Sequence, residues 1–203
     1  MAGPQALTVL NRSVPSGTHI CAFYSGPAGR DEVVMRFLAE GIRAGEKTIC
    51  VLESMGPAEI VARLGREVDL GRSVETGQLE LATPADAYLR TGTFAPDDML
   101  SYWEQAITEA RGPGGTGMLR AAGEMPSALN HPEGRMEFFR YEARVTGFAA
   151  NLPAVFLCLY DLQRFGAETL IDSLRTHPMV VVEGVVHENP CYTEPGAFLR
   201  GTE

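Results

Sequence analysis

The chain carries HICAFY at residues 19–24, RDEVVMRFLAEGIRA at 30–44 and KTICVLE at 47–53. The first and third stretches are short and almost entirely apolar, which is typical of strands buried on both faces of a parallel sheet. The middle stretch repeats apolar residues at helical spacing: Val33, Val34, Phe37, Leu38 and Ile42. Together the three stretches predict a strand–helix–strand unit, the building block of parallel α/β sheets.

The same alternation continues along the chain. Further strands are predicted at 78–83, 117–125 and 154–161, and further helices at 57–65, 97–111, 133–151 and 167–176. The stretch AVFLCLYD at 154–161 is the most apolar and is predicted to be the central strand. Two apolar runs around Glu183 and Gly184 predict a C-terminal hairpin.

These elements predict a three-layer α/β sandwich, with a mostly parallel sheet, helices on both faces and a C-terminal β-hairpin. The sequence shows no internal repeat and no linker. Residues 18–203 are therefore predicted to be one domain. Residues 1–17 are rich in Gly, Pro and Ser and are predicted to be an N-terminal tail.

Composition excludes several classes of function. The chain has 203 residues and a formal net charge of −9, which argues against direct nucleic-acid binding because phosphate contacts need clustered basic residues. Neither a secretory signal nor an apolar run of membrane-spanning length is present, so we expect a cytoplasmic protein that does not enter a membrane. Its four cysteines form no CxxC pair and are predicted to be reduced.

In a parallel sheet, ligands bind outside the carboxyl ends of the strands. Applied here, that rule selects residues that follow the apolar strands, together with two aromatic residues of the loop 84–95. Apolar walls with a few polar groups suit a small molecule. The predicted ligand-binding residues are Tyr24, Ser25, Glu53, Tyr88, Phe94, Glu124, Met125, Tyr160 and Asp161.

The turn after the first strand, YSGPAGRDE, does not match a phosphate-binding loop, which ends in GK(S/T). Here Arg30 is followed by Asp31, which repels phosphate, and the single lysine, Lys47, starts the next strand at the opposite edge of the sheet. Two interpretations of Glu124 and Asp161 remain open. They hold magnesium or activate water, or they cap helices and pair with arginines.

His19, Cys21 and Cys158 offer nitrogen and sulfur ligands within one sheet, because His19 and Cys21 alternate along a strand and share a face. They are candidates for a metal or haem site. The alternative is a core histidine beside core thiols. Because no pair of ligands has a diagnostic spacing, we predict no metal and no other cofactor.

Several segments, in this order, resemble the MEDS domain, the methanogen/methylotroph sensory domain. They are residues 19–53, GQLELATPADAYLRTGTF at 77–94, GEM at 123–125, YEAR at 141–144 and LCLYDLQRFGAETLIDSLRTHPMVVVEG at 157–184. The resemblance implies a RecA-like fold, related to circadian-clock ATPases, that has lost its phosphate loop. It also implies sensing of small molecules, including hydrocarbon derivatives. His19, Tyr24, Glu124, Cys158, Tyr160 and Asp161 match the family's motif positions.

The leading functional hypothesis is a non-catalytic domain of bacterial signal transduction that binds a small molecule. It would pass the resulting change to a separate histidine kinase, anti-sigma-type kinase or regulator. One alternative is a divergent nucleotide-binding protein or ATPase that uses Glu124 and Asp161 with magnesium. Another is a protein-interaction scaffold that binds no ligand. Assembly into a homo-oligomer is left open.

Overall fold

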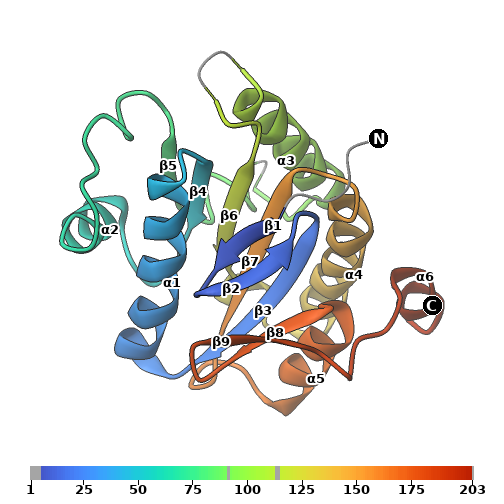
Figure 1. Cartoon of the computed structure of the whole chain (residues 1–203). Helices are drawn as coiled ribbons and strands as arrows, with labels where there is room; N and C mark the ends of the chain where they lie inside the picture. Colours follow the sequence, from blue (N-terminus) through green and yellow to red (C-terminus); the bar gives the residue numbers. More distant parts are fainter. Residues whose placement is uncertain (1–5, 91, 113–114, 203) are drawn as a thin grey trace.

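The strand–helix–strand unit predicted from the first fifty residues forms part of a seven-stranded sheet. The computed structural model describes residues 6–90, 92–112 and 115–202 (Figure 1). The strand order is β5-β4-β6-β7-β3-β8-β9, and all neighbours are parallel except β8 and β9. The strands are β3 (Thr18–Tyr24), β4 (Lys47–Val51), β5 (Leu79–Ala82), β6 (Leu119–Glu124), β7 (Ala154–Asp161), β8 (Met179–Val182) and β9 (Val185–Glu188). As predicted, 154–161 is the middle strand.

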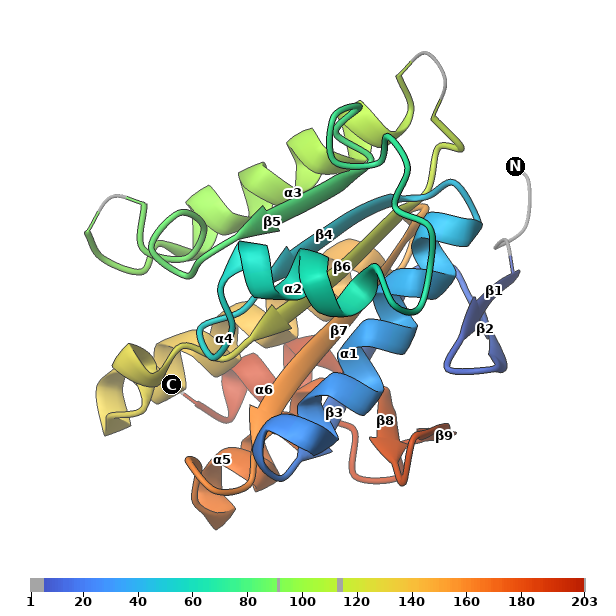
Figure 2. The same cartoon turned by 90° about the vertical axis from the view of Figure 1, so that its left-hand side faces the viewer.

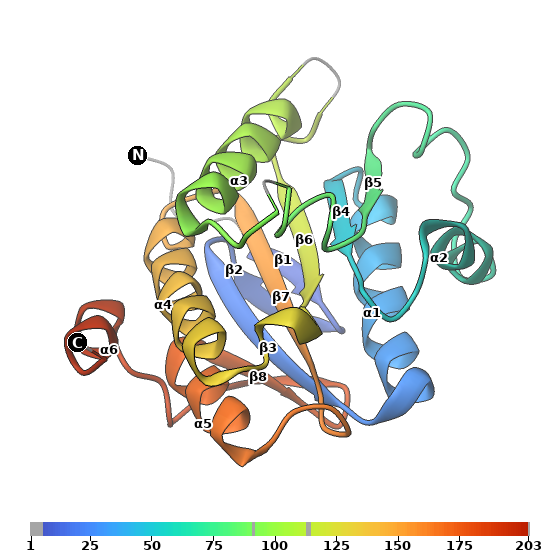
Figure 3. The same ribbon diagram turned by 180° about the vertical axis from the view of Figure 1, so that it is seen from behind.

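Helices cover both faces of this sheet. Figure 2 shows α1 (Gly26–Arg43) and α2 (Pro57–Leu64) in front of one face. Figure 3 shows α3 (Pro96–Ala110) and α4 (Pro132–Ala149) over the other. The remaining helices on that second side are α5 (Ala167–Thr176), α6 (Pro195–Arg200) and the short 3₁₀ helix η1 (Ser127–Leu129). The predicted three-layer sandwich is therefore confirmed.

The N-terminal tail predicted over residues 1–17 is wrong for residues 6–15. They form an antiparallel hairpin of β1 (Ala6–Val9) and β2 (Arg12–Pro15), which lies beside α1 in Figure 2. Two distant side chains hold this hairpin. Buried Arg120 donates to the Thr8 carbonyl at 2.8 Å, and Glu40 accepts the Leu10 N–H at 2.9 Å. Local composition could not reveal contacts with residues so far along the chain. Residues 1–5 lie outside the described part of the chain.

The C-terminal hairpin was predicted correctly. Glu183 and Gly184, the two residues between β8 and β9, have φ values of 50° and 72°. Two successive positive φ values are those of a type I′ turn, which matches the twist of the strands it joins. Within the described residues, no helix is both long and apolar enough to cross a membrane.

The two faces of the sheet pack against different cores. Aliphatic residues predominate under α1 and α2. The core under α3 and α4 is rich in aromatic rings, among them Tyr88, Phe94, Trp103, Phe138, Tyr141 and Phe156. This aromatic side also holds a group of buried ionisable residues.

Candidate functional site

At the carboxyl edge of the sheet, Glu124 ends β6 with its carboxylate turned inward. Its Oε2 accepts the backbone N–H groups of Glu53 and Ser54, each at 2.8 Å, and its Oε1 accepts a short hydrogen bond from the Tyr24 hydroxyl. Burial and the Glu124 carboxylate raise the pKa of Tyr24 well above its usual value. Glu124 is 1 % exposed. The carboxylate is thus fully occupied by donors from its own chain.

Glu53 closes the same edge from the outside. It accepts the Ser127 N–H at 3.0 Å and the Ser127 hydroxyl at 2.8 Å, and it pairs with Arg164 at 2.5 Å. Burial opposes ionisation of Glu53, but the bonds from Ser127 and Arg164 outweigh it and lower the pKa. These contacts join the loop after β4 to the loops after β6 and β7.

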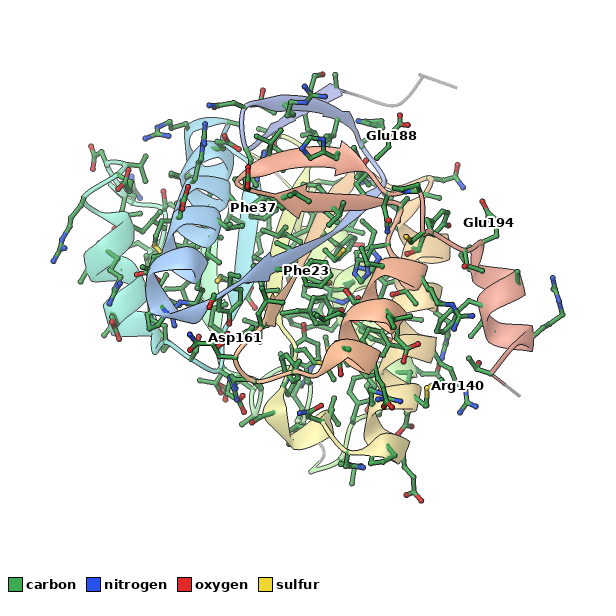
Figure 4. The ribbon with its side chains drawn as sticks, turned by 90° about the horizontal axis from the view of Figure 1, so that it is seen from below. Phe23, Phe37, Arg140, Asp161, Glu188 and Glu194 are labelled. Carbon is green, nitrogen blue, oxygen red and sulfur yellow. The ribbon has the colours of Figure 1, made fainter. Side chains whose placement is uncertain are left out.

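Asp161 lies at the end of β7, beside the start of α1, as Figure 4 shows from this edge. It accepts the N–H groups of Gln163 at 3.0 Å and Gly26 at 3.5 Å, which are the contacts of a capping carboxylate. Only Ser25 separates β3 from α1, which is too short for a phosphate-binding loop. Arg30 donates to the Ser54 hydroxyl at 2.7 Å and to Asp31 at 2.7 Å.

The remaining predicted ligand-binding residues divide into two groups. Ser25 is exposed, and Met125 and Tyr160 are buried near the strand ends. Tyr88 and Phe94 lie in the same aromatic core as Met125 and Tyr160, with their ring centroids 6.4 Å apart. The structure therefore does not gather the nine residues around one opening, and the hydrogen bonds of Tyr24 and Glu124 weigh against an open pocket there.

A hollow of about 10 Å³ lies between the sheet and the helices α3 and α4. That volume suits about one water molecule. We call its lining residues the aromatic chamber: Tyr88, Trp103, Ala121, Gly123, Tyr141, Glu142, Val145, Phe156, Leu157 and Cys158. The Trp103 indole N–H donates to the Tyr141 hydroxyl at 2.7 Å. A Cβ at position 123 would stand 2.2 Å from the Tyr88 hydroxyl, so the glycine leaves the room that the Tyr88 ring occupies.

Four side chains converge at one end of this chamber, from β3, α4, β7 and the end of α5. Their ligand atoms all lie within 4.8 Å of one another, and we call them the His–Cys cluster: His19, Glu142, Cys158 and His177. The His19 Nε2 is 3.1 Å from the Cys158 Sγ and 3.2 Å from the Glu142 Oε2. The His177 Nε2 is 2.9 Å from the same carboxylate oxygen.

Burial governs the ionisation of the cluster. It lowers the pKa of His19 to about 4, with the neighbouring His177 adding to the effect. It also raises the pKa of Cys158 well above its usual value, reinforced by the negative charge of Glu142. Burial also opposes ionisation of Glu142, and its pKa is lowered only if the imidazoles donate Nε2–H bonds to its carboxylate. At neutral pH the cluster therefore contains a protonated thiol and a neutral His19.

Of the three residues that the sequence offered as metal-ligand candidates, His19 and Cys158 belong to the cluster and Cys21 does not. Cys21 shares the strand face of His19, but its thiol is directed to the Met179 carbonyl at 3.7 Å, and burial raises its pKa to about 12. Glu142 and His177 were missed. Glu142 had a signal, because it lies one helical turn after Phe138 on the buried face of α4. His177, just before a proline, had none.

Residues 18–178 match the family model described as MEDS, the MEthanogen/methylotroph, DcmR Sensory domain. The transcriptional repressor DcmR of Methylorubrum extorquens is 31% identical over 163 residues, which are 78% of this chain and 57% of the repressor. The chain thus spans little more than half the length of that relative.

A solved structure shares the architecture. The KaiC-like protein of the hyperthermophilic archaeon Pyrococcus horikoshii superposes with a TM-score of 0.55 and 14% identity, over 82% of this chain and 70% of that one. At this identity the likeness concerns the fold alone, and it confirms the predicted RecA-like sandwich.

Proposed function

This chain belongs to the MEDS family of sensory domains, and from this premise we propose that it is a non-catalytic, small-molecule-binding part of a bacterial signalling system. The observation that carries the proposal is the aromatic chamber, a buried hollow with apolar walls that borders a carboxylate and a thiol. Apolar walls with a few polar groups are what small-molecule sites require. A separate kinase or regulator would receive the signal.

The chamber is preferred over the carboxyl edge because the polar groups of the two regions differ in their partners. Glu124 at the edge accepts hydrogen bonds from three donors. Among the described residues, in contrast, the Glu142 Oε2 in the chamber wall, the neighbouring His177 Nε2 and the Tyr160 Oη have no hydrogen-bond partner. Buried polar groups without partners are uncommon and mark places where a ligand or ion adds contacts. A ligand larger than water requires Tyr88 and its loop to move, which would couple binding to a change of shape.

The nucleotide alternative has less support. The one-residue junction before α1 cannot wrap phosphates, and Arg30 is already bound to Ser54 and Asp31. Calorimetry with ATP and Mg²⁺ should show no binding at micromolar concentrations. Micromolar affinity would favour the nucleotide-binding function instead.

A pair of adjacent alanines allows a matched test of the chamber. Ala121 lines the hollow, whereas Ala122 points into the aliphatic core on the other face. Short-chain alcohols, aldehydes and haloalkanes are screened by thermal shift, alongside native mass spectrometry of protein purified from its own host. A ligand at 100 times its Kd adds about 2.7 kcal/mol of stability.

Ala121→Val should abolish the shift caused by the ligand, and Ala122→Val should retain it. An equal shift in both variants would place binding outside the chamber. A co-purifying protein, without any small molecule from the screen or the host, would favour the scaffold alternative.

A further inference from the structure

The His–Cys cluster has more acceptors than donors, and its outer hydrogen bonds fix this count. The His177 Nδ1 is 2.7 Å from the Ser173 carbonyl oxygen. A carbonyl oxygen only accepts, so Nδ1 carries the proton and donates. In the neutral ring, Nε2 is then an unprotonated lone pair that faces the Glu142 carboxylate at 2.9 Å.

The same reasoning applies to His19. The Thr146 hydroxyl donates to the Thr176 carbonyl at 2.7 Å, so its oxygen accepts from the His19 Nδ1 at 2.8 Å. The His19 Nε2 is therefore also a lone pair directed at the cluster. Three acceptor atoms, two imidazole nitrogens and a carboxylate oxygen, converge where the Cys158 thiol offers one proton.

From this juxtaposition we propose that His19, Glu142, Cys158 and His177 bind a divalent transition-metal ion, for which zinc is the best chemical match. Two imidazoles, a thiolate and a carboxylate are the ligands that Zn²⁺ takes in four-coordinate sites. The sequence spacing does not predict this site, because its four ligands are spread over 159 positions, from 19 to 177.

Three further features of the structure fit a metal ion. Each histidine has its other ring nitrogen bonded to an oxygen acceptor, the arrangement that orients metal-binding imidazoles. The Glu142 Oε2 and His177 Nε2 have no hydrogen-bond partner among the described residues. All four side chains come from the sheet or its packed helices, so the protein holds them in place without the metal.

Charge balance also favours the ion. Binding of M²⁺ to the thiol forms a metal–sulfur bond and releases the thiol proton to solvent, which leaves one thiolate and one carboxylate around a double positive charge. The sum is zero, so the core acquires no net charge. Because His19 and His177 are fully buried, we expect the ion to enter during folding or local opening.

The site rests on geometry that is independent of the proposed small-molecule sensing. Its place beside the aromatic chamber would put a metal ion at the wall of the hollow, since Glu142 and Cys158 belong to both. A domain that binds metal but no small molecule would retain this inference and lose the proposed function. A domain that binds a small molecule but no metal would retain the proposed function and lose this inference.

The test uses the untagged, reduced 203-residue chain, freed of metal by unfolding with a chelator and refolding. Titration with Co²⁺ should give one bound ion per chain, tetrahedral visible bands and a near-ultraviolet sulfur-to-cobalt charge-transfer band. Zn²⁺ should displace the cobalt and abolish these bands. Cys158→Ser, Glu142→Gln and His177→Gln should each weaken binding by more than about 100-fold, because loss of outer contacts alone costs 10–100-fold.

Exposed residues provide the controls. Cys191→Ser and His187→Gln remove a thiol and an imidazole from the surface and should leave the titration unchanged. Thr146→Val, which removes only the acceptor of the His19 Nδ1, should weaken binding by about 10–100-fold. Circular dichroism of the metal-free variants shows whether each one folds.

Two results would overturn the proposal. One is wild-type protein that binds no Co²⁺ or Zn²⁺ at micromolar concentrations, in which case a proton on the His177 Nε2 satisfies Glu142. The other is binding without a charge-transfer band, or binding that the ligand variants retain, which would indicate an adventitious surface site. The wild-type spectrum alone decides the matter if a cluster variant fails to fold.

Discussion

Two buried glutamates, Glu124 and Glu142, lie 1 % exposed on the same sheet-and-helix framework but in opposite chemical surroundings. Glu124 is surrounded by donors, two backbone N–H groups and the Tyr24 hydroxyl. Glu142 faces two imidazole lone pairs and a thiol. A buried carboxylate costs little when donors surround it and much when acceptors do. Glu124 therefore stabilises the fold, whereas the surroundings of Glu142 favour a bound cation.

The contacts of Glu124 also explain why the strand-end residues predicted to bind a ligand do not line the chamber. In open α/β sheets, the strand ends are free to receive a ligand. Here the loops after β4, β6 and β7 are joined to one another through Glu53, Ser127 and Arg164. The polar groups that would contact a ligand at this edge contact each other instead.

Removing the satisfied carboxylate should have the largest effect. Glu124→Ala leaves two backbone N–H groups and one hydroxyl without their acceptor in a buried place. We expect a loss of about 3–5 kcal/mol in the free energy of unfolding, measured by urea denaturation. A loss below about 1 kcal/mol would show that Glu124 is not the structural group described here.

Removing one donor from the same carboxylate should cost less. Tyr24→Phe keeps the ring and the backbone donors and deletes only the hydroxyl that bonds to Glu124. We expect a loss of about 1.5–3 kcal/mol, the range for a hydrogen bond to a charged group. Tyr192→Phe, a half-buried tyrosine away from this edge, should change stability by less than about 0.5 kcal/mol under the same denaturation.

The contrasting carboxylate should tolerate neutralisation when no metal is present. In Glu142→Gln the amide can donate to an imidazole lone pair, so it supplies the donor that the cluster lacks. The metal-free variant should remain within about 1 kcal/mol of the metal-free wild type. The matched change Glu124→Gln should cost more, because it replaces three hydrogen bonds to a carboxylate with weaker bonds between neutral groups. Equal losses in the two variants would remove the distinction between these sites.

The smallest expected effect is on the pH dependence of stability, through the contacts of Glu53 at the carboxyl edge of the sheet. Contacts with Ser127 and Arg164 hold the pKa of Glu53 below its ordinary value of 4.5. The stability that this adds is present above the unfolded pKa and is lost as the pH falls through the folded one. Glu53→Gln should therefore lose less stability than wild type between about pH 5 and pH 3. The difference should stay below about 1 kcal/mol because Glu53 and Arg164 are partly exposed. Equal pH profiles of the variant and the wild type would show that the Glu53 carboxylate adds no stability.

Sequence patterns predicted the regular elements well because each carries its own signal. The apolar run at 154–161 was long enough to mark the central strand, and helical spacing placed α3, α4 and α5. The hairpin at residues 6–15 was missed for the opposite reason. Its strands have four residues each, and it depends on Arg120 and Glu40 rather than on its own pattern.

The sequence by itself determined the layered fold, the lack of a phosphate loop and the family, because periodicity and motif order are properties of nearby residues. Only the tertiary structure decided which polar groups meet. It brought His19 to Glu142 and His177 across more than a hundred residues, and it buried Tyr88 and Phe94 in the aromatic core instead of placing them at an open strand-end pocket. A hydrogen bond or a metal ligand depends on a distance of about 3 Å, and sequence spacing does not encode such a distance between remote elements of a sheet.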